Sequence, residues 1–257
     1  MYGYCPLASG SRGNCILVVT PKAKILVDAG LSGRMTQERL SAFGIELEQI
    51  DAILITHEHL DHIRGLGQLA VKKRIPLFAN YETARAIVSH LGCCPTFTLF
   101  RTGEPFVFRD LSITPFPIQH DAVEPVAFTL QVDGVKLGLC ADLGWASALV
   151  EQNLQGSHYL YLESNHEPSM VESSSRPDYL KRRILGRSGH LSNGECASLL
   201  RKLLHPALRH LHLAHLSSEC NSYERALASA RKALAQLGSQ LPVAVAPQEK
   251  PGCFLAF

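Results

Sequence analysis

The sequence lacks the features that would mark a membrane or secreted protein. No stretch approaches the roughly 18 consecutive apolar residues that a membrane-spanning helix needs. The first residues, Met1 to Pro6, have neither the basic start nor the apolar stretch of a secretory signal peptide. There is also no internal repeat, low-complexity tract or long Pro/Gly/Ser linker. We therefore predict a cytoplasmic protein that does not enter a membrane.

A strong excess of charge is missing as well. Charged residues make up 19% of the 257 residues and the formal net charge is only +2, so composition alone does not argue for binding nucleic acid or an anionic membrane. The eight cysteines contain no C-x-x-C pair, which argues against a zinc ribbon. The adjacent Cys93 and Cys94 have poor geometry for an ordinary disulfide. We expect free thiols, and Cys15 and Cys140 lie in apolar runs where a thiol acts as a small hydrophobic group.

Hydrophobic residues are plentiful at 46%, and their spacing predicts strands and hairpins followed by helices, twice over. Apolar runs predict strands at 16–19, 24–27, 51–56, 76–79, 113–118, 126–132, 135–140, 158–163, 208–214, 243–245 and 254–257. Helices are predicted at 35–43, 66–73, 192–204 and 222–237. Asp133-Gly134 predicts a two-residue hairpin, and Ser192-x-x-Glu195 predicts a capping box. The pattern suits two packed sheets with outer helices, and we predict one α/β (α+β) domain over residues 1–257.

The most informative feature is a cluster of histidines around one aspartate. His57, His59, Asp61 and His62 directly follow the predicted strand 51–56. Residues i and i+2 of a helix point apart, whereas a strand end followed by a tight turn can aim these side chains at one point. Imidazole nitrogens and carboxylate oxygens suit zinc, manganese and iron. The alternative is a structural cluster at a helix start capped by Asp61, but such a dense group has no common structural purpose.

These four residues match the H-x-H-x-D-H motif of the metallo-β-lactamase superfamily, whose fold is a four-layer αββα sandwich. Further ligands of that superfamily follow later strands, and here His120, Asp142 and His215 follow predicted strands in the same order. The resemblance implies two divalent metal ions, zinc first, with manganese or iron as alternatives. The implied ligands are His57, His59 and His120 for one ion, Asp61, His62 and His215 for the other, and Asp142 as a bridge.

Asp28 resembles the superfamily aspartate that orients a ligand histidine from behind. Its alternative role is that of a turn residue before Gly30. Ala127 and Ala141 stand where glycine and threonine are usual in related sequences, and neither replaces a ligand.

Three further segments narrow the resemblance to the YycJ/WalJ-type metallohydrolases, which are related to ribonuclease Z and the β-CASP nucleases. The segments are Ser9-Gly10-Ser11-Arg12-Gly13-Asn14, Glu163-Ser164-Asn165-His166-Glu167 and Gly189-His190-Leu191-Ser192-Asn193. Glu167 departs from the family, which usually has aspartate there.

The resemblance implies a phosphodiester hydrolase, and a 5′ to 3′ DNA exonuclease is the first hypothesis. Asp61 would position the nucleophile as well as bind metal. His190 would donate a proton to the leaving oxygen, Glu163 would orient His190, and His166 would contact the substrate. Alternatively, His190 only caps a helix. The candidate substrate-binding residues are Ser11, Asn14, Asn165 and Arg183.

Three alternative functions stay open. A small-molecule or cyclic phosphodiesterase would use the same ligands. A hydrolase of thioesters or lactams is disfavoured by the sequence around His120. A metal-binding module without catalysis is disfavoured because a structural zinc site typically closes with four ligands. The sequence does not decide the metal, DNA versus RNA, the direction of cleavage or the oligomeric state.

Overall fold

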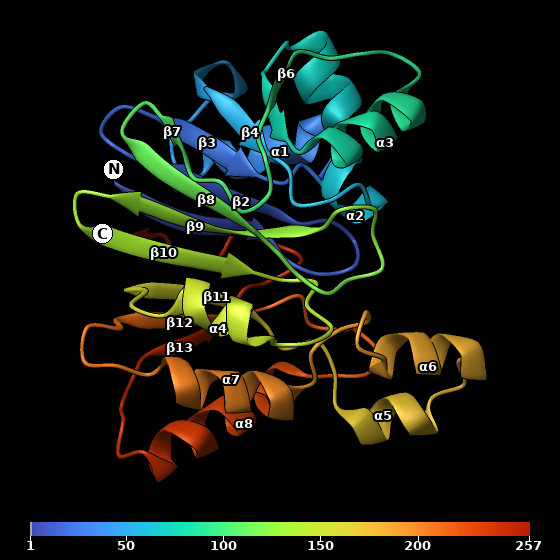
Figure 1. Ribbon diagram of the computed structural model, residues 1–257, viewed down its shortest axis with the longest axis vertical. Coiled ribbons are helices and arrows are strands. Elements are labelled where there is room, and N and C mark those ends of the chain that lie inside the picture. The colour runs from blue at the N-terminus through green and yellow to red at the C-terminus, as the bar shows by residue number, and fades with distance from the viewer. Residues whose placement is uncertain (1) are drawn as a thin grey trace. The chain divides into compact units, whose positions relative to one another are not determined.

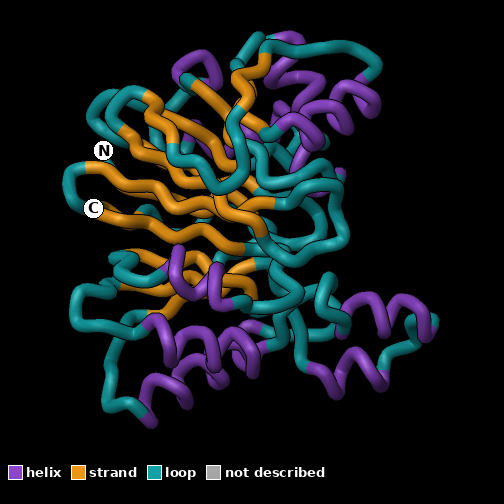
Figure 2. Tube along the Cα trace, in the orientation of Figure 1, coloured by secondary structure: helices purple, strands orange, loops and turns teal. Residues whose placement is uncertain are grey.

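The structure is a computed structural model that describes residues 2–257. The chain forms two compact units, each with a β-sheet and helices (Figures 1 and 2). The first unit consists of Met1–Pro115, Ala122–Val126 and Pro247–Phe257, and the second of Phe116–Asp121 and Ala127–Ala246. The single domain expected from the sequence stays a prediction.

The first unit is built on a mixed sheet with the strand order β14-β1-β2-β3-β4-β5-β6. Pairs from β14 to β3 are antiparallel, and pairs from β3 to β6 are parallel. A hairpin joins β7 to β8, and β8 continues into the second unit. The strands are β1 (Gly3–Ala8), β2 (Cys15–Val19), β3 (Lys24–Val27), β4 (Ala52–Leu54), β5 (Leu77–Ala79), β6 (Phe97–Leu99), β7 (Phe106–Phe108), β8 (Leu111–Pro117) and β14 (Leu255–Ala256).

Helical segments cover one face of this first sheet (Figure 1). Leu40, Leu69 and Ile87 come from three of these segments and share a buried cluster with Leu17 and Ile53 of the sheet. Burying this apolar area is the main stabilising contribution to the unit. The segments are α1 (Gly33–Ser41), the 3-10 helix η1 (Leu47–Gln49), α2 (Leu60–Ile63), the π-helix η2 (Gly67–Lys72) and α3 (Tyr81–Leu91).

The second unit contains the strand order β13-β12-β11-β10-β9. The pairs from β13 to β10 are parallel, and β9 pairs antiparallel with β10. Asp133 and Gly134 turn the β9–β10 hairpin with φ angles of 47° and 75°, as the sequence predicts. The strands are β9 (Val126–Val132), β10 (Val135–Cys140), β11 (Tyr159–Glu163), β12 (His210–Ala214) and β13 (Val243–Val245).

Three helices of the second unit pack against the leucines of β11 and β12. The buried cluster joins Leu154 of α4, Leu200 of α7 and Ala230 of α8 to Leu162 and Leu213 of the strands. The capping box at Ser192 is present as predicted. Helices α5 and α6 form a smaller cluster of their own. The helices are α4 (Ala148–Leu154), α5 (Pro168–Ser173), α6 (Asp178–Leu185), α7 (Asn193–Leu203) and α8 (Tyr223–Gln236).

Two expectations from composition can be compared with the structure. All eight cysteines are free thiols, with Cys15 and Cys140 buried as expected, while Cys93, Cys94 and Cys253 are exposed. Within residues 2–257, no helix is long and apolar enough to cross a membrane.

Candidate metal centre

Both sheets carry histidines or carboxylates just after the C-terminal ends of parallel strands. In the first unit Asp28 follows β3, and His57 follows β4 after two intervening residues. In the second unit Glu163 ends β11, and His215 follows β12 directly. The C-terminal ends of parallel strands meet at one edge of a sheet, which is where α/β proteins bind their ligands.

In the first unit, Asp28 and Thr56 fix the rings of two motif histidines. His62 Nδ1 lies 2.7 Å from Asp28 Oδ2, and the Thr56 hydroxyl lies 2.9 Å from both Asp28 Oδ2 and His57 Nδ1. Thr56 Oγ1 donates its hydrogen to the Asp28 carboxylate. The lone pairs of Thr56 Oγ1 can therefore accept a hydrogen bond from His57 Nδ1–H. These contacts favour protonation at Nδ1 in both rings, so Nε2 carries the lone pair that a metal ion would need.

His59 and Asp61 lie beside this pair and are partly exposed. The rings of His57 and His59 are 4.6 Å apart, and Asp61 Oδ2 is 3.5 Å from His62 Nε2. The four residues of the motif therefore come together within the first unit. Asn14 joins them, because its amide nitrogen lies 3.2 Å from Asp61 Oδ2. Ser11, the other candidate from that loop, is exposed.

In the second unit, Glu163 lies at the centre of a buried hydrogen-bond group. Its Oε1 accepts from His190 Nδ1 at 2.8 Å and from His215 Nδ1 at 2.9 Å. Its Oε2 accepts from the backbone N–H groups of Leu143 at 2.6 Å and Leu191 at 3.1 Å. The residue is fully buried, and its negative charge is stabilised by these four hydrogen bonds.

The ionisation of Glu163 and His190 follows from this arrangement. Burial alone would raise the pKa of the Glu163 carboxyl, but the charge and hydrogen bonds of the two histidines hold this pKa below its usual value. Burial alone would lower the pKa of His190, but the Glu163 carboxylate outweighs it and raises that pKa. The pair therefore favours a carboxylate beside a protonated imidazole.

Asp142 and His120 extend this group. Asp142 Oδ1 lies 3.2 Å from His215 Nδ1 and 3.8 Å from His120 Nε2. His120 Nδ1 donates to the carbonyl of Gly189 at 3.1 Å, so its Nε2 is the atom available to a metal. Asp142, Glu163, His190 and His215 offer ligand atoms within 4.8 Å of one another. Asp142 and His215 have the donor types that fit a divalent cation, whereas Glu163 and His190 pair with each other.

Asn165, His166 and Arg183 were expected to contact substrate, but their own contacts lie within the protein. Asn165 Nδ2 donates to the carbonyl of His215 at 2.7 Å. His166 is only 1% exposed, and burial lowers its pKa. Arg183 is exposed and forms an ion pair with Asp121, the residue after His120. Their substrate contacts stay predictions.

Sequence reasoning missed two residues of these groups, Thr56 and Asn221. Thr56 directly precedes the motif, so its hydroxyl was a usable signal. Asn221 lies in the loop between β12 and α8, and its amide donates to the carbonyls of Ser164 and Asn165 at 2.8 and 3.0 Å. No motif surrounds Asn221, and its role depends on a contact 57 residues away in the chain.

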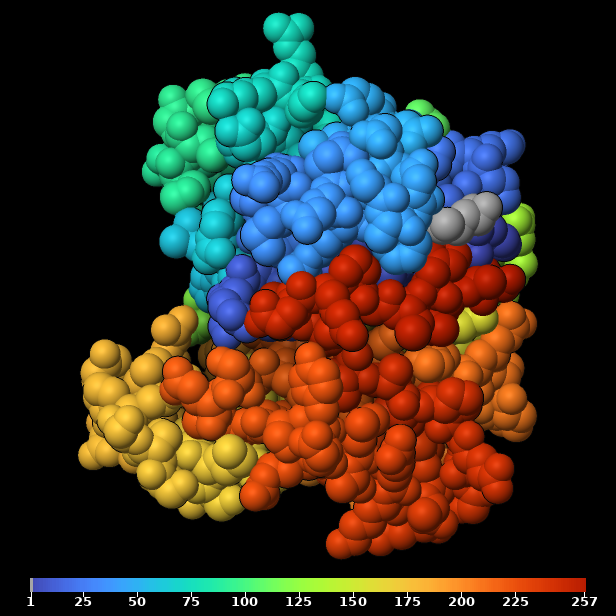
Figure 3. Space-filling view, turned by 180° about the vertical axis from the view of Figure 1, so that it is seen from behind, coloured from blue at the N-terminus to red at the C-terminus, as the bar shows by residue number. Residues whose placement is uncertain are grey.

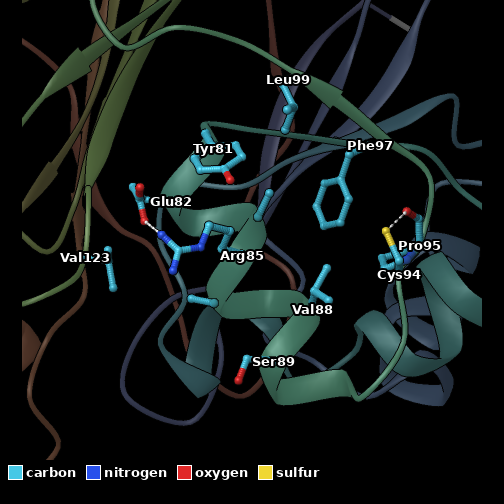
Figure 4. Close-up of a pocket in the computed structure, with 12 residues that line it drawn as sticks. Tyr81, Glu82, Arg85, Val88, Ser89, Cys94, Pro95, Phe97, Leu99 and Val123 are labelled. Carbon is cyan, nitrogen blue, oxygen red and sulfur yellow. Dashed lines mark hydrogen bonds and ion pairs between the residues drawn. The ribbon is translucent and has the colours of Figure 1, made fainter.

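The first unit also contains a cavity of about 810 Å³ beside α3. Figure 4 shows Tyr81 and Val88 of α3 facing Phe97 and Leu99 of β6, with Val123 at one side. The lining described here is mainly apolar and includes none of the histidines or aspartates above. Its chemistry therefore does not suit metal binding.

Residues 8–146 match the metallo-beta-lactamase superfamily. The fold and the strand-end histidines and carboxylates define a member of this superfamily of metal-dependent hydrolases, and the predicted αββα sandwich fold is confirmed. The solved structure of the metallo-beta-lactamase fold protein YhfI from Bacillus subtilis superposes with a TM-score of 0.72 at 16% identity, covering 97% of each chain.

Two relatives place the chain more closely. It is 37% identical to exodeoxyribonuclease YycJ of Bacillus anthracis, over 90% of this chain and 89% of the relative. It is also 37% identical to exodeoxyribonuclease WalJ of Streptococcus pneumoniae, over 91% of this chain and 89% of the relative. The chain belongs to the YycJ/WalJ-type family, as its motifs predict, and the protein is an enzyme that uses divalent metal.

Proposed function

We propose that the protein cleaves phosphodiester bonds with two divalent metal ions and acts as an exonuclease on DNA. The observation that carries the proposal is the Glu163 group, which couples a strand-end histidine, His215, to a second histidine, His190. His215 is suited to bind metal, and His190 is suited to carry a proton. The names of the two relatives support DNA as the substrate.

The proposed ligands divide into two sets with a bridge, following the superfamily pattern. Zinc is the first expectation and manganese or iron the alternatives, because the same donor types serve all three. His57, His59 and His120 would hold one ion, Asp61, His62 and His215 would hold the other, and Asp142 would contribute to both.

A bound pair of divalent ions supplies an activated water and offsets the negative charge that develops on phosphate oxygens. The protein's own residues do the remaining work. Asp28 and Thr56 hold the rings of His62 and His57. Asp61, partly exposed, orients the attacking water as well as ligating.

His190 is the proposed proton donor to the leaving oxygen. Its Nδ1 is held by Glu163 at 2.8 Å, so Nε2 carries the proton that can be given away. Its side chain is 22% exposed, which allows it to meet a substrate, whereas His166 is 1% exposed. Ser192 caps α7, which argues against the helix-capping alternative for His190.

Binding of DNA requires positive side chains near the path of the phosphates. Arg182, Arg183 and Arg187 are exposed in the second unit, and Lys72 and Arg74 in the first. Arg183 is held by Asp121 next to His120, so it is the arginine we propose for a phosphate contact beside the scissile bond. A cytoplasmic location is part of the proposal.

The test is a substrate panel. Zinc and manganese forms are incubated with 5′-labelled single- and double-stranded DNA and RNA, and with a cyclic nucleotide. We expect early release of the 5′ label from DNA in a mononucleotide or short oligonucleotide, because cleavage begins at the labelled end. Hydrolysis of the cyclic nucleotide alone would favour a small-molecule phosphodiesterase, and no hydrolysis of any phosphodiester would contradict the proposal.

A further inference from the structure

The loop Gly10–Asn14 is held against the histidine motif by its own backbone. Asn14 N–H donates to the carbonyl of Asp61 at 2.7 Å, and Asn14 C=O accepts from Gly30 N–H at 2.8 Å. The side-chain oxygen of Asn14 accepts from Gly10 N–H at 2.8 Å. The orientation of the amide is thereby set, and its nitrogen is directed at the motif.

The Asn14 amide nitrogen meets two proposed metal ligands. It lies 3.2 Å from Asp61 Oδ2 and 3.0 Å from His62 Nε2. The His62 Nε2 lone pair can accept a hydrogen bond from the amide or bind a metal ion, but not both. When a metal ion is bound, the hydrogen bond to Asp61 is therefore the contact that the Asn14 amide keeps. Asn14 is 4% exposed, which leaves little surface for a substrate.

We infer that Asn14 is a positioning residue that holds the Asp61 carboxylate ready to bind metal, and that it does not bind substrate. This inference rests on the proposed function, in which Asp61 and His62 bind the second ion. A hydrogen bond from a neighbouring group typically affects metal affinity by restricting the ligand to its binding orientation.

The backbone of the loop packs closely against the backbone around the motif. A Cβ on Gly30 would lie 1.7 Å from the Asp61 carbonyl oxygen and 2.6 Å from Asn14 N. A Cβ on Gly13 would lie 2.6 Å from the Gly30 carbonyl oxygen. Backbone meets backbone at each of these points, so a displacement of the loop would displace Asp61.

The C-terminal segment braces the loop from its other side. Gln248 Oε1 accepts from Arg12 N–H and Gln248 Nε2 donates to the Gly13 carbonyl, both at 3.0 Å. The buried Arg39 donates to the carbonyls of Leu7 at 2.6 Å and Gln248 at 3.0 Å. Figure 3 shows the red C-terminal residues lying against the blue N-terminal part of the first unit. Gln248 therefore contributes to the position of Asn14, and through it of Asp61.

The experiment uses the full chain with metal removed and then titrated with Co²⁺. Binding is followed by calorimetry and by the visible absorption of the bound ion, which reports its coordination. The variants are Asn14→Ala and Gln248→Ala. The matched control is Asn153→Ala in α4, whose amide bonds only to its own helix at Leu149.

We expect Asn14→Ala to weaken the second Co²⁺ ion by about 10- to 100-fold, with a changed absorption spectrum and an unchanged first ion. Gln248→Ala should weaken the same ion less, and Asn153→Ala should match the wild type. If Asn14→Ala fails to fold, as melting of the metal-free protein would show, Gln248→Ala carries the test. The inference is overturned if the folded variants bind both ions as the wild type does, or weaken both equally. A wild type that binds fewer than two ions would instead contradict the proposed function.

Discussion

Replacing Glu163 by glutamine removes the charge from the buried hydrogen-bond group at the end of β11. The carboxylate accepts two bonds at each oxygen, from His190 and His215 on one side and from Leu143 and Leu191 on the other. A glutamine amide has only one accepting oxygen. Its NH₂ group would face the two donors that the second carboxylate oxygen had accepted from. Two charge-assisted bonds of about 1.5–3 kcal/mol each are lost, so we expect a cost of roughly 3–6 kcal/mol.

Thermal melting of the metal-free protein in a chelator measures this effect without metal binding. For a chain of this size a loss of 1 kcal/mol lowers Tm by about 2–4 °C, so Glu163→Gln should lower Tm by at least about 6 °C. The control is Glu151→Gln, whose carboxylate pairs with the exposed Lys202 and should cost at most about 1 kcal/mol. Equal Tm values for the two variants would refute the reasoning.

Two further substitutions test the packing and the chemistry. Gly30→Ala should sharply lower Tm in a thermal scan, because its Cβ would lie 1.7 Å from the Asp61 carbonyl oxygen. The control is Gly67→Ala, which has nothing within 4 Å of its Cβ and should leave Tm unchanged. Equal Tm values for the two variants would show that the loop can move to accept the methyl group. His190→Ala should lose turnover of a bis-aryl phosphate by about 10²- to 10⁴-fold with metal content unchanged, and loss of metal, measured by mass spectrometry, would make His190 a ligand and not a proton donor.

The sequence could predict the elements whose signals are local. The β9–β10 hairpin and the capped helices α7 and α8 are where the turn residues and caps place them. β1 was missed, and it contains Pro6, which has no N–H for the ladder, and a bulge follows that residue. α3 was missed although Asn80 caps its start and Gly92 its end. The segment predicted as an ordinary helix at 66–73 is the π-helix η2.

The candidate site, like the fold, could be predicted only where its signals are local in the sequence. The types and order of the proposed ligands were readable because each follows an apolar run. Their geometry was not, because Asp28, Asp142 and His215 have positive φ angles of 62°, 53° and 53°, a conformation that is uncommon outside glycine. Nor does any local pattern predict that Glu163 accepts from histidines 27 and 52 residues further along the chain. The pairing with His215 follows from the parallel neighbours β11 and β12, and the pairing with His190 from the position of the loop before α7.

The central claim is that the motif after β4 binds metal and that this metal hydrolyses phosphodiesters. It is tested most directly by comparing the wild type with His59→Ala for bound metal and for hydrolysis of a bis-aryl phosphate. The wild type should hold two divalent ions per chain and hydrolyse the ester. His59→Ala should lose at least one ion and nearly all activity, and a variant that retains both metal and activity would contradict the account.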